Sequence, residues 1–136
     1  MDQVVPRVFI GDSSDAAMAA RGYGTQPVTH ILNCAVDLPA AEGAVPVTHR
    51  GFSDGGGATV EELRAAVEEL ERLYERGDSI LVHCHVGRSR SVTVVATFLA
   101  RKDKIPLELA FMTVAHARAI AYPVKELVWL ARALVA

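Results

Sequence analysis

The sequence predicts a single-domain, three-layer α/β fold for a chain of 136 residues. Short apolar runs rich in branched residues, which are typical of buried strands, come early in the chain. Patterns with helical periodicity dominate its second half. Between the two, a polar loop joins the apolar run at residues 79–82 to a helical pattern that begins at Val92. In three-layer α/β folds the site lies at the carboxyl ends of the strands, so we expect it in this loop.

The first third of the chain predicts two strands and a helix. Residues 4–10 indicate an edge strand, because Pro6 is tolerated only at the margin of a sheet. The Gly-Asp-Ser-Ser sequence that follows offers a turn and a helix cap, and an alanine-rich helix then continues to about Arg21. Residues 28–34 predict a central strand, parallel to the strand at 79–82.

The middle of the chain predicts a short strand, a loop and a long helix. Residues 45–49 form the strand, and residues 51–58 hold four glycines and indicate a mobile loop. Thr59 and Glu62 have the spacing of a capping box. The helix that they open keeps its apolar period as far as Arg76.

Three further helices complete the prediction. The first covers residues 92–102, and two more cover residues 107 to about 120 and 124 to about 134, separated by a proline. Phe111 and Trp129, on the last two helices, are expected in the core because large aromatic side chains are usually buried.

Composition excludes several classes of function. The formal net charge of −2 argues against a general nucleic-acid binder, and the longest apolar run, residues 92–100, is too short to cross a bilayer. Two cysteines indicate no disulfide framework, and the N-terminal residues lack the pattern of a signal peptide. We therefore expect a monomeric cytoplasmic protein, in which a reactive thiol stays reduced.

The loop after residues 79–82 is suited to bind an anion. A strand-to-helix turn directs its backbone amides to one point, where the helix N-terminus adds positive potential. Arg90 supplies a planar guanidinium that matches two phosphate oxygens, and Cys84 stands where the same donors stabilise a thiolate. A thiolate that faces a bound phosphate is placed for in-line attack. The predicted phosphate-binding residues are His85, Val86, Gly87, Arg88, Ser89 and Arg90.

Other side chains of the loop have supporting or open roles. Ser91 can donate to the sulfur and make it a better leaving group, while His83 is placed to brace the loop. Arg88 is either a cation that selects the substrate or a surface residue at the helix start. His85 either touches the substrate or faces solvent, and Gly87 relieves crowding where the backbone wraps around a ligand.

The stretch from His83 to Ser91 reads His-Cys-x-x-Gly-x-Ser-Arg-Ser and resembles the signature of the cysteine-based dual-specificity protein phosphatases. Residues 28–33 resemble the family's Ile-Thr-His-Val-Leu-Asn segment. The resemblance covers nearly the whole chain and implies a three-layer α/β/α phosphatase fold with a central, mostly parallel sheet. It also implies hydrolysis of a phosphorylated protein or peptide through a phosphocysteine intermediate, with no metal or other cofactor.

Ester cleavage also needs a general acid. Asp54 is our first candidate, since it lies 30 residues before Cys84 on the glycine-rich loop, and the resembling family has an aspartate about this far upstream in that role. Asp37 is the second candidate. The C-terminal region departs from the family: only Arg118 and Pro123 match its Arg-Pro and Pro-Asn pairs, which puts the substrate preference in doubt.

Three functions are compatible with these residues. The first is a protein phosphatase with a shallow pocket that admits phosphotyrosine, phosphoserine and phosphothreonine. The second is a phospholipid phosphatase, because the loop sequence with Arg88 directly after the glycine also resembles the phosphatidylglycerophosphate-phosphatase branch, and an extra cation suits an anionic lipid surface. The third is a phosphate-binding module without turnover. Cys34 is expected to be an ordinary buried cysteine, although a reversible disulfide with Cys84 is conceivable.

Overall fold

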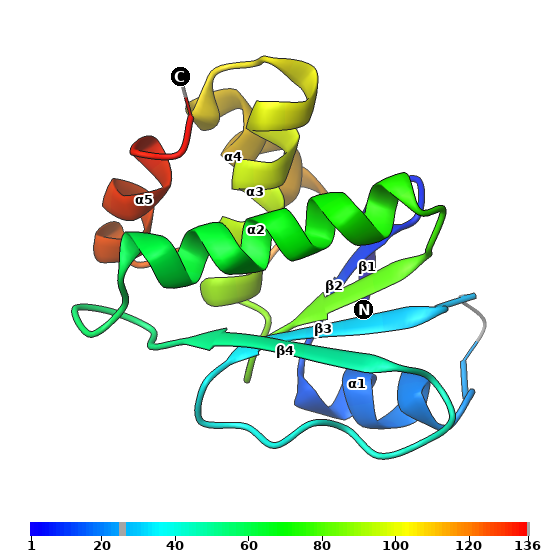
Figure 1. Cartoon of the computed structure of the whole chain (residues 1–136). Coiled ribbons are helices and arrows are strands. Elements are labelled where there is room, and N and C mark those ends of the chain that lie inside the picture. The colour runs from blue at the N-terminus through cyan, green and yellow to red at the C-terminus, as the bar shows by residue number, and fades with distance from the viewer. Residues whose placement is uncertain (25–26, 136) are drawn as a thin grey trace.

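Five strands form one mixed sheet, with β5 at its centre, in a computed structural model that describes residues 1–24 and 27–135 (Figure 1). The order across the sheet is β1-β2-β5-β3-β4. The four neighbours β2, β5, β3 and β4 run parallel, and only the edge strand β1 is antiparallel. The prediction of a central strand parallel to its neighbour is confirmed. The strands are β1 (Asp2–Val5), β2 (Val8–Gly11), β3 (His30–Ala35), β4 (Val47–Phe52) and β5 (Ile80–His83).

The single edge strand predicted at residues 4–10 is wrong, because this segment is a hairpin. Pro6 and Arg7 lie in the turn between β1 and β2, and Arg7 has a positive φ of 69°. Its guanidinium donates to the carbonyls of Tyr74 and Asp78, at 3.0 and 2.9 Å. The turn is therefore held by contacts with a segment about 70 residues further along the chain, which no local pattern predicts.

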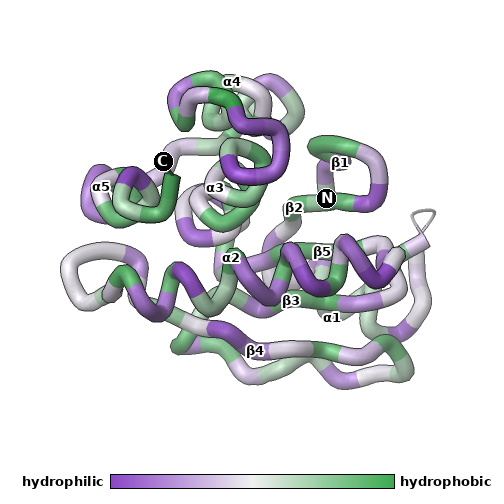
Figure 2. Tube along the Cα trace, turned by 45° about the horizontal axis from the view of Figure 1, so that its top comes forward, coloured by the Kyte–Doolittle hydropathy of each residue, from purple (hydrophilic) through white to green (hydrophobic). Residues whose placement is uncertain are grey.

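Helices cover both faces of the sheet, as expected for three layers. Helix α1 lies on one face, and α2 to α5 lie on the other (Figure 1). The alternation of side chains along the strands separates two cores: Phe9 and Leu81 pack on α1, whereas Ile10 and Val82 belong to the larger core beneath the other helices. In Figure 2, hydrophilic and hydrophobic residues alternate along α2, and its buried residues recur every three or four positions, as expected of a helix with one face on the sheet.

The helix boundaries agree with local capping signals and differ where such signals are absent. The capping box of Thr59 and Glu62 is formed, with 3.0 and 3.1 Å hydrogen bonds. No side chain among the described residues caps the N-terminus of any of the three helices that follow, and each begins or ends away from the predicted residues. The helices are α1 (Ser13–Ala20), α2 (Val60–Glu75), α3 (Arg90–Asp103), α4 (Leu107–Ala117) and α5 (Lys125–Arg132).

The core position predicted for Trp129 is also wrong. Helix α5 directs Leu127 and Ala131 into the core, and the Trp129 side chain, on another side of the helix, is 74% exposed. Phe111 does pack against the core and is partly buried. Within the described part of the chain, no helix is long and apolar enough to span a membrane.

Candidate active site

Three chain segments meet at the carboxyl edge of the sheet. Gly11 at the end of β2 and Asn33 near the end of β3 both pair with His83, the last residue of β5. The N-terminus of α1, the turn after β3 and the loop at residues 84–89 therefore leave the sheet at the same level.

The carbonyl groups of the loop all point away from its centre. Each carbonyl from residue 84 to residue 89 accepts a hydrogen bond from a group outside this segment, and none of the amides of residues 85–89 donates to a backbone carbonyl among the described residues. The amides are thus left free to converge on one point at the N-terminus of α3. For the carbonyls of residues 84, 85 and 86, the donors are the His83 ring, the Ser13 amide and the Arg118 guanidinium. For those of residues 87, 88 and 89, the donors are again the Arg118 guanidinium, the Tyr122 amide and Thr93.

Residue 87 must be a glycine because protein atoms beneath the loop leave no room for a side chain. Its φ of 74° is left-handed, and a Cβ there would lie 2.5 Å from the Gly11 carbonyl oxygen and 2.6 Å from a nitrogen of Arg118. The crowding comes from the protein beneath the loop, which differs from the expectation that the glycine makes room for a ligand.

Cys84 lies at the bottom of the loop with its sulfur 3.2 Å from the hydroxyl oxygen of Ser91. Burial by itself would raise the pKa of the thiol. Hydrogen bonds from the Ser91 hydroxyl and from the amides of Ser91 and Gly87 outweigh burial, and with the charge of Arg90 they lower the pKa below the usual value of 9.0. The loop therefore favours a thiolate.

Arg90 presents one free edge of its guanidinium. Its Nη1 donates to Asp37, at 2.6 Å, and to the carbonyl of Phe52, at 3.2 Å. Its Nε is buried and has no partner among the described residues. The Nε side of the guanidinium is thus available for two oxygens of a phosphate, while the other side is held in place.

Asp37 reaches Arg90 because Asn33 shapes the turn after β3. The Asn33 side chain accepts from the Ala35 amide, at 2.9 Å, and donates to the carbonyl of Leu38, at 3.1 Å. The hydrogen bond from Arg90 lowers the pKa of Asp37, which keeps this carboxylate ionised. Sequence reasoning considered Asp37 only as a proton donor and missed its contact with Arg90, since 53 residues separate the two.

A cavity of about 290 Å³ opens above the sulfur. Cys84 and Arg90 line it, and Asp54 does so from the loop after β4, so the structure brings together all three residues. Asp37 is not among the lining residues. Arg88 borders the cavity with its guanidinium over the Tyr122 ring, 5.6 Å from the ring centroid. The remaining lining residues are His85, Val86, Ser89, Tyr122 and Val124.

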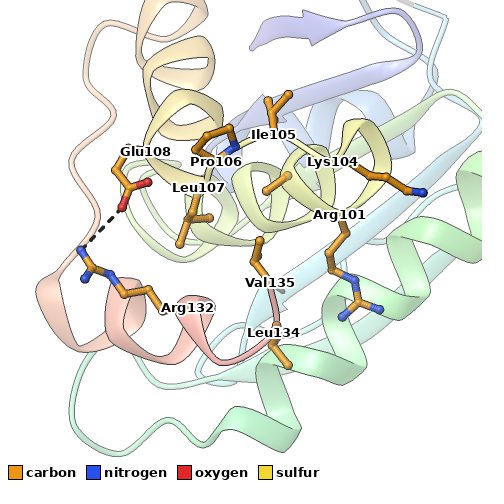
Figure 3. Close-up of a pocket in the computed structure, with 10 residues that line it drawn as sticks. Arg101, Lys104, Ile105, Pro106, Leu107, Glu108, Arg132, Leu134 and Val135 are labelled. Atoms are coloured by element: carbon orange, nitrogen blue, oxygen red, sulfur yellow. Dashed lines mark ion pairs between the residues drawn. The ribbon is translucent and has the colours of Figure 1, made fainter.

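A larger cavity of about 780 Å³ lies at the other end of α3 (Figure 3). Arg101, Lys104 and Arg132 surround an apolar floor there, and no cysteine, serine or histidine lines it. Size alone therefore does not identify the site. Among residues 1–24 and 27–135, no three histidine, cysteine or acidic side chains converge where they could hold a metal ion.

Comparison with known proteins agrees with this geometry. Residues 8–130 match the family model described as "Dual specificity phosphatase, catalytic domain". The chain is 32% identical over 127 residues to human dual specificity phosphatase 28, covering 89% of this chain and 69% of that protein. It is 29% identical over 124 residues to human dual specificity protein phosphatase 22, covering 90% and 67%. The chain belongs to the dual specificity phosphatase family.

Solved structures show the same relationship. The crystal structure of human dual specificity phosphatase 28 superposes with a TM-score of 0.87 at 25% identity and covers 98% of this chain and 94% of that one. A mouse putative dual specificity phosphatase complexed with zinc tungstate gives 0.84 at 26% identity, covering 98% and 84%. The protein is thus a cysteine-based dual-specificity protein phosphatase, and the phospholipid alternative is not favoured.

Arg118 is the residue of this phosphatase that sequence reasoning undervalued. The side chain is buried, its Nε and Nη2 hold the carbonyls of Gly87 and Val86 at 2.6 and 3.1 Å, and its Nη1 pairs with Asp2 at 2.8 Å. Only the match to the family's arginine singled it out in the sequence. This arginine supports the loop directly from beneath.

Two other predicted residues are placed as follows. His83 donates from Nδ1 to the Cys84 carbonyl at 3.0 Å, and burial lowers the pKa of its ring. Cys34 is fully buried in the larger core, and this burial raises its pKa well above the usual value.

Proposed function

We propose that Cys84 is the nucleophile of this phosphatase and that Arg90, with the loop amides, holds the phosphate. The observation that carries the proposal is the outward orientation of the loop carbonyls, which leaves the amides and one edge of Arg90 around the Cys84 sulfur. Such preorganised donors stabilise the charge on the equatorial oxygens during transfer.

In the first step the Cys84 thiolate attacks phosphorus, and the bond from phosphorus to the ester oxygen breaks. Asp54 gives its proton to the departing oxygen, so that the alcohol or phenol leaves neutral. The product is a phosphocysteine on the enzyme.

In the second step a water molecule gives a proton to the Asp54 carboxylate and attacks the phosphocysteine. The sulfur–phosphorus bond breaks, and inorganic phosphate forms. The Ser91 hydroxyl, 3.2 Å from the sulfur, stabilises the thiolate as it leaves.

The choice of Asp54 over Asp37 as the acid rests on two contrasts. Asp54 lines the cavity and Asp37 does not. Asp37 is bound to Arg90, which lowers its pKa and makes it a poor proton donor.

Asp54→Asn is expected to lower kcat by about 10²-fold on a phosphothreonine peptide. The loss on p-nitrophenyl phosphate should be smaller, because nitrophenolate leaves readily without a proton. Measurement of kcat on both substrates with the wild type and the variant checks this. An equal loss of kcat on the two substrates would show that Asp54 is not the general acid.

The substrate is proposed to be a protein or peptide that carries phosphotyrosine, phosphoserine or phosphothreonine. His85 and Val86 at the cavity rim are exposed, which agrees with a shallow site. Turnover of matched peptides that differ only in the phosphorylated residue tests this breadth.

The covalent intermediate gives the sharpest test of the mechanism. Rapid acid quenching of the enzyme with ³²P-labelled phosphopeptide, in reductant and chelator, should trap label on Cys84. Neither label nor turnover should be found with Cys84→Ser. Turnover that the chelator abolishes would contradict the mechanism.

We also propose that the chain acts as one domain and as a monomer in the cytoplasm. The cavity is complete within one chain, and a thiolate of low pKa needs a reducing compartment. Light scattering on an active sample checks the oligomeric state, and fractionation of cells checks the location.

A further inference from the structure

Two large aromatic side chains next to the phosphate cavity are mostly exposed. Trp129 on α5 is 74% exposed, and Tyr122 just before α5 is 70% exposed. The Arg88 guanidinium lies over the Tyr122 ring, and both residues line the phosphate cavity. Aromatic residues of this kind dominate the energetics of protein interfaces.

Hollows on both sides of Trp129 connect these side chains with the site. One, of about 710 Å³, is lined by Trp129 together with Tyr122 and Val124, and the last two also line the phosphate cavity. A second, of about 420 Å³, separates Trp129 from Gly55 and the loop that carries Asp54. When the phosphorylated residue of a substrate chain enters the cavity, the neighbouring residues of that substrate therefore lie close to apolar hollows.

We propose that Tyr122 and Trp129 form a subsite for an apolar side chain of the substrate, a few residues from its phosphorylated residue. The inference rests on the proposed function, and it names the kind of peptide which that function selects. Burying an apolar side chain against the indole contributes affinity in proportion to the area removed from water.

The occupant that fits these hollows is a peptide. Tyr122 and Val124 line both the phosphate cavity and the larger hollow, so an occupant of the hollow is continuous with the phosphorylated residue in the cavity. The charge beside the indole is mixed, because Glu126 and Lys125 line both hollows and Arg132 lines the larger one. A neutral apolar side chain of the same peptide needs no partner for either charge.

Position-specific kinetics give the first test. The reference is a phosphotyrosine peptide in which the residues on both sides of the phosphotyrosine are serines. It is compared with a series of peptides that each carry one leucine in place of one of these serines. At one or two positions, leucine should raise kcat/KM by about tenfold, in the range that partial burial of this side chain supplies. Trp129→Ala should lose this gain, while turnover of p-nitrophenyl phosphate, which has no flanks, stays unchanged.

Met112→Ala is the matched control. Met112 on α4 is 67% exposed and lines none of the hollows described, so this variant should keep the gain from leucine. A gain that survives in Trp129→Ala, or leucine peptides that are no better than serine peptides, would overturn the inference.

Fluorescence gives a second test that needs no turnover. Trp129 is the only tryptophan of the chain, so emission reports directly on this indole. Titration of Cys84→Ser with the favoured leucine peptide should shift the emission to the blue, and the serine peptide should not. Active enzyme without the shift would refute the subsite alone, whereas the shift without any turnover by the wild type would refute the proposed function alone. A shift caused by phosphatidylglycerol vesicles and by no peptide would replace the subsite with a membrane contact.

Discussion

The neighbouring strands β3 and β5 each bring a buried cysteine to the carboxyl edge of the sheet, Cys34 within the end of β3 and Cys84 directly after β5, and the two thiols have opposite properties. Cys34 is fully buried and Cys84 is 3% exposed, so burial raises the pKa of both thiols. Only Cys84 has donors that reverse this effect, namely the Ser91 hydroxyl and the amides of Ser91 and Gly87. The lowered pKa of Cys84 therefore comes from the loop and the first turn of α3, which follow this cysteine and supply the donors.

At the end of β3 and in the turn that follows, the backbone donor next to the cysteine is already occupied. The Ala35 amide, next to Cys34, is taken by the side chain of Asn33 at 2.9 Å. No hydrogen bond lowers the pKa of Cys34, and the thiol packs as an apolar group in the larger core. What this turn supplies to the site is Asp37, which holds Arg90.

Substitution of the two cysteines should give the largest contrast. Cys84→Ser removes the proposed nucleophile, and we expect a loss of kcat of about 10³-fold or more on phosphopeptides. Cys34→Ala should leave kcat/KM within about twofold and lower the free energy of unfolding by ~1 to 2 kcal/mol, because it leaves a small cavity. Steady-state assays and urea unfolding measure both, and a large loss of activity in a folded Cys34→Ala protein would contradict the comparison.

Arg90→Lys tests the guanidinium edge, at the start of α3, that we propose binds phosphate. An ammonium cannot bind two oxygens and keep the contacts with Asp37 and Phe52, so kcat/KM should fall by about 10²-fold. Arg101→Lys is the control, since Arg101 on the same helix also pairs with a carboxylate, Glu71, but far from the site. Equal losses in both variants would indicate a general effect on α3.

Asp37→Asn tests the contribution of the turn after β3. Asparagine keeps an oxygen for Arg90 but removes the charge, and Phe52 still accepts from Nη1. Because Asp37 is more than half exposed, we expect only about a tenfold loss of kcat/KM, chiefly through weaker phosphate binding. Inhibition by inorganic phosphate should weaken in parallel. A loss of kcat that depends on the leaving group would instead make Asp37 the acid.

Ser91→Ala should produce the smallest change, a shift in pH dependence. The thiolate is present above the pKa of Cys84, so alkylation by iodoacetamide rises with pH through that pKa and then levels off. Removing the hydroxyl donor raises the pKa, so the midpoint moves to higher pH and the rate below it falls. Mass spectrometry should find label on Cys84, and on Cys34 only after unfolding. An unchanged midpoint would show that the amides alone set the pKa.

Part of this structure follows from neighbouring residues. The capping box at Thr59, the strand before Cys84 and the loop with its cysteine and arginine depend on groups within a few residues of one another. Binary patterning likewise predicts the parallel strands and the two faces of α2. Where a local signal was weak or ambiguous, as for Pro6 and for Trp129, the prediction was wrong.

The sequence by itself determined the layered fold and the family, and it supplied the residues proposed to hold a phosphate against Cys84, because these depend on local periodicity and on one continuous motif. Only the tertiary structure decided that Arg118 supports the loop from beneath, that Asp37 holds Arg90 and that Trp129 is exposed beside the site. The first two features join residues separated by 31 to 116 positions, and their hydrogen bonds exist only once the sheet has brought the strand ends to one level.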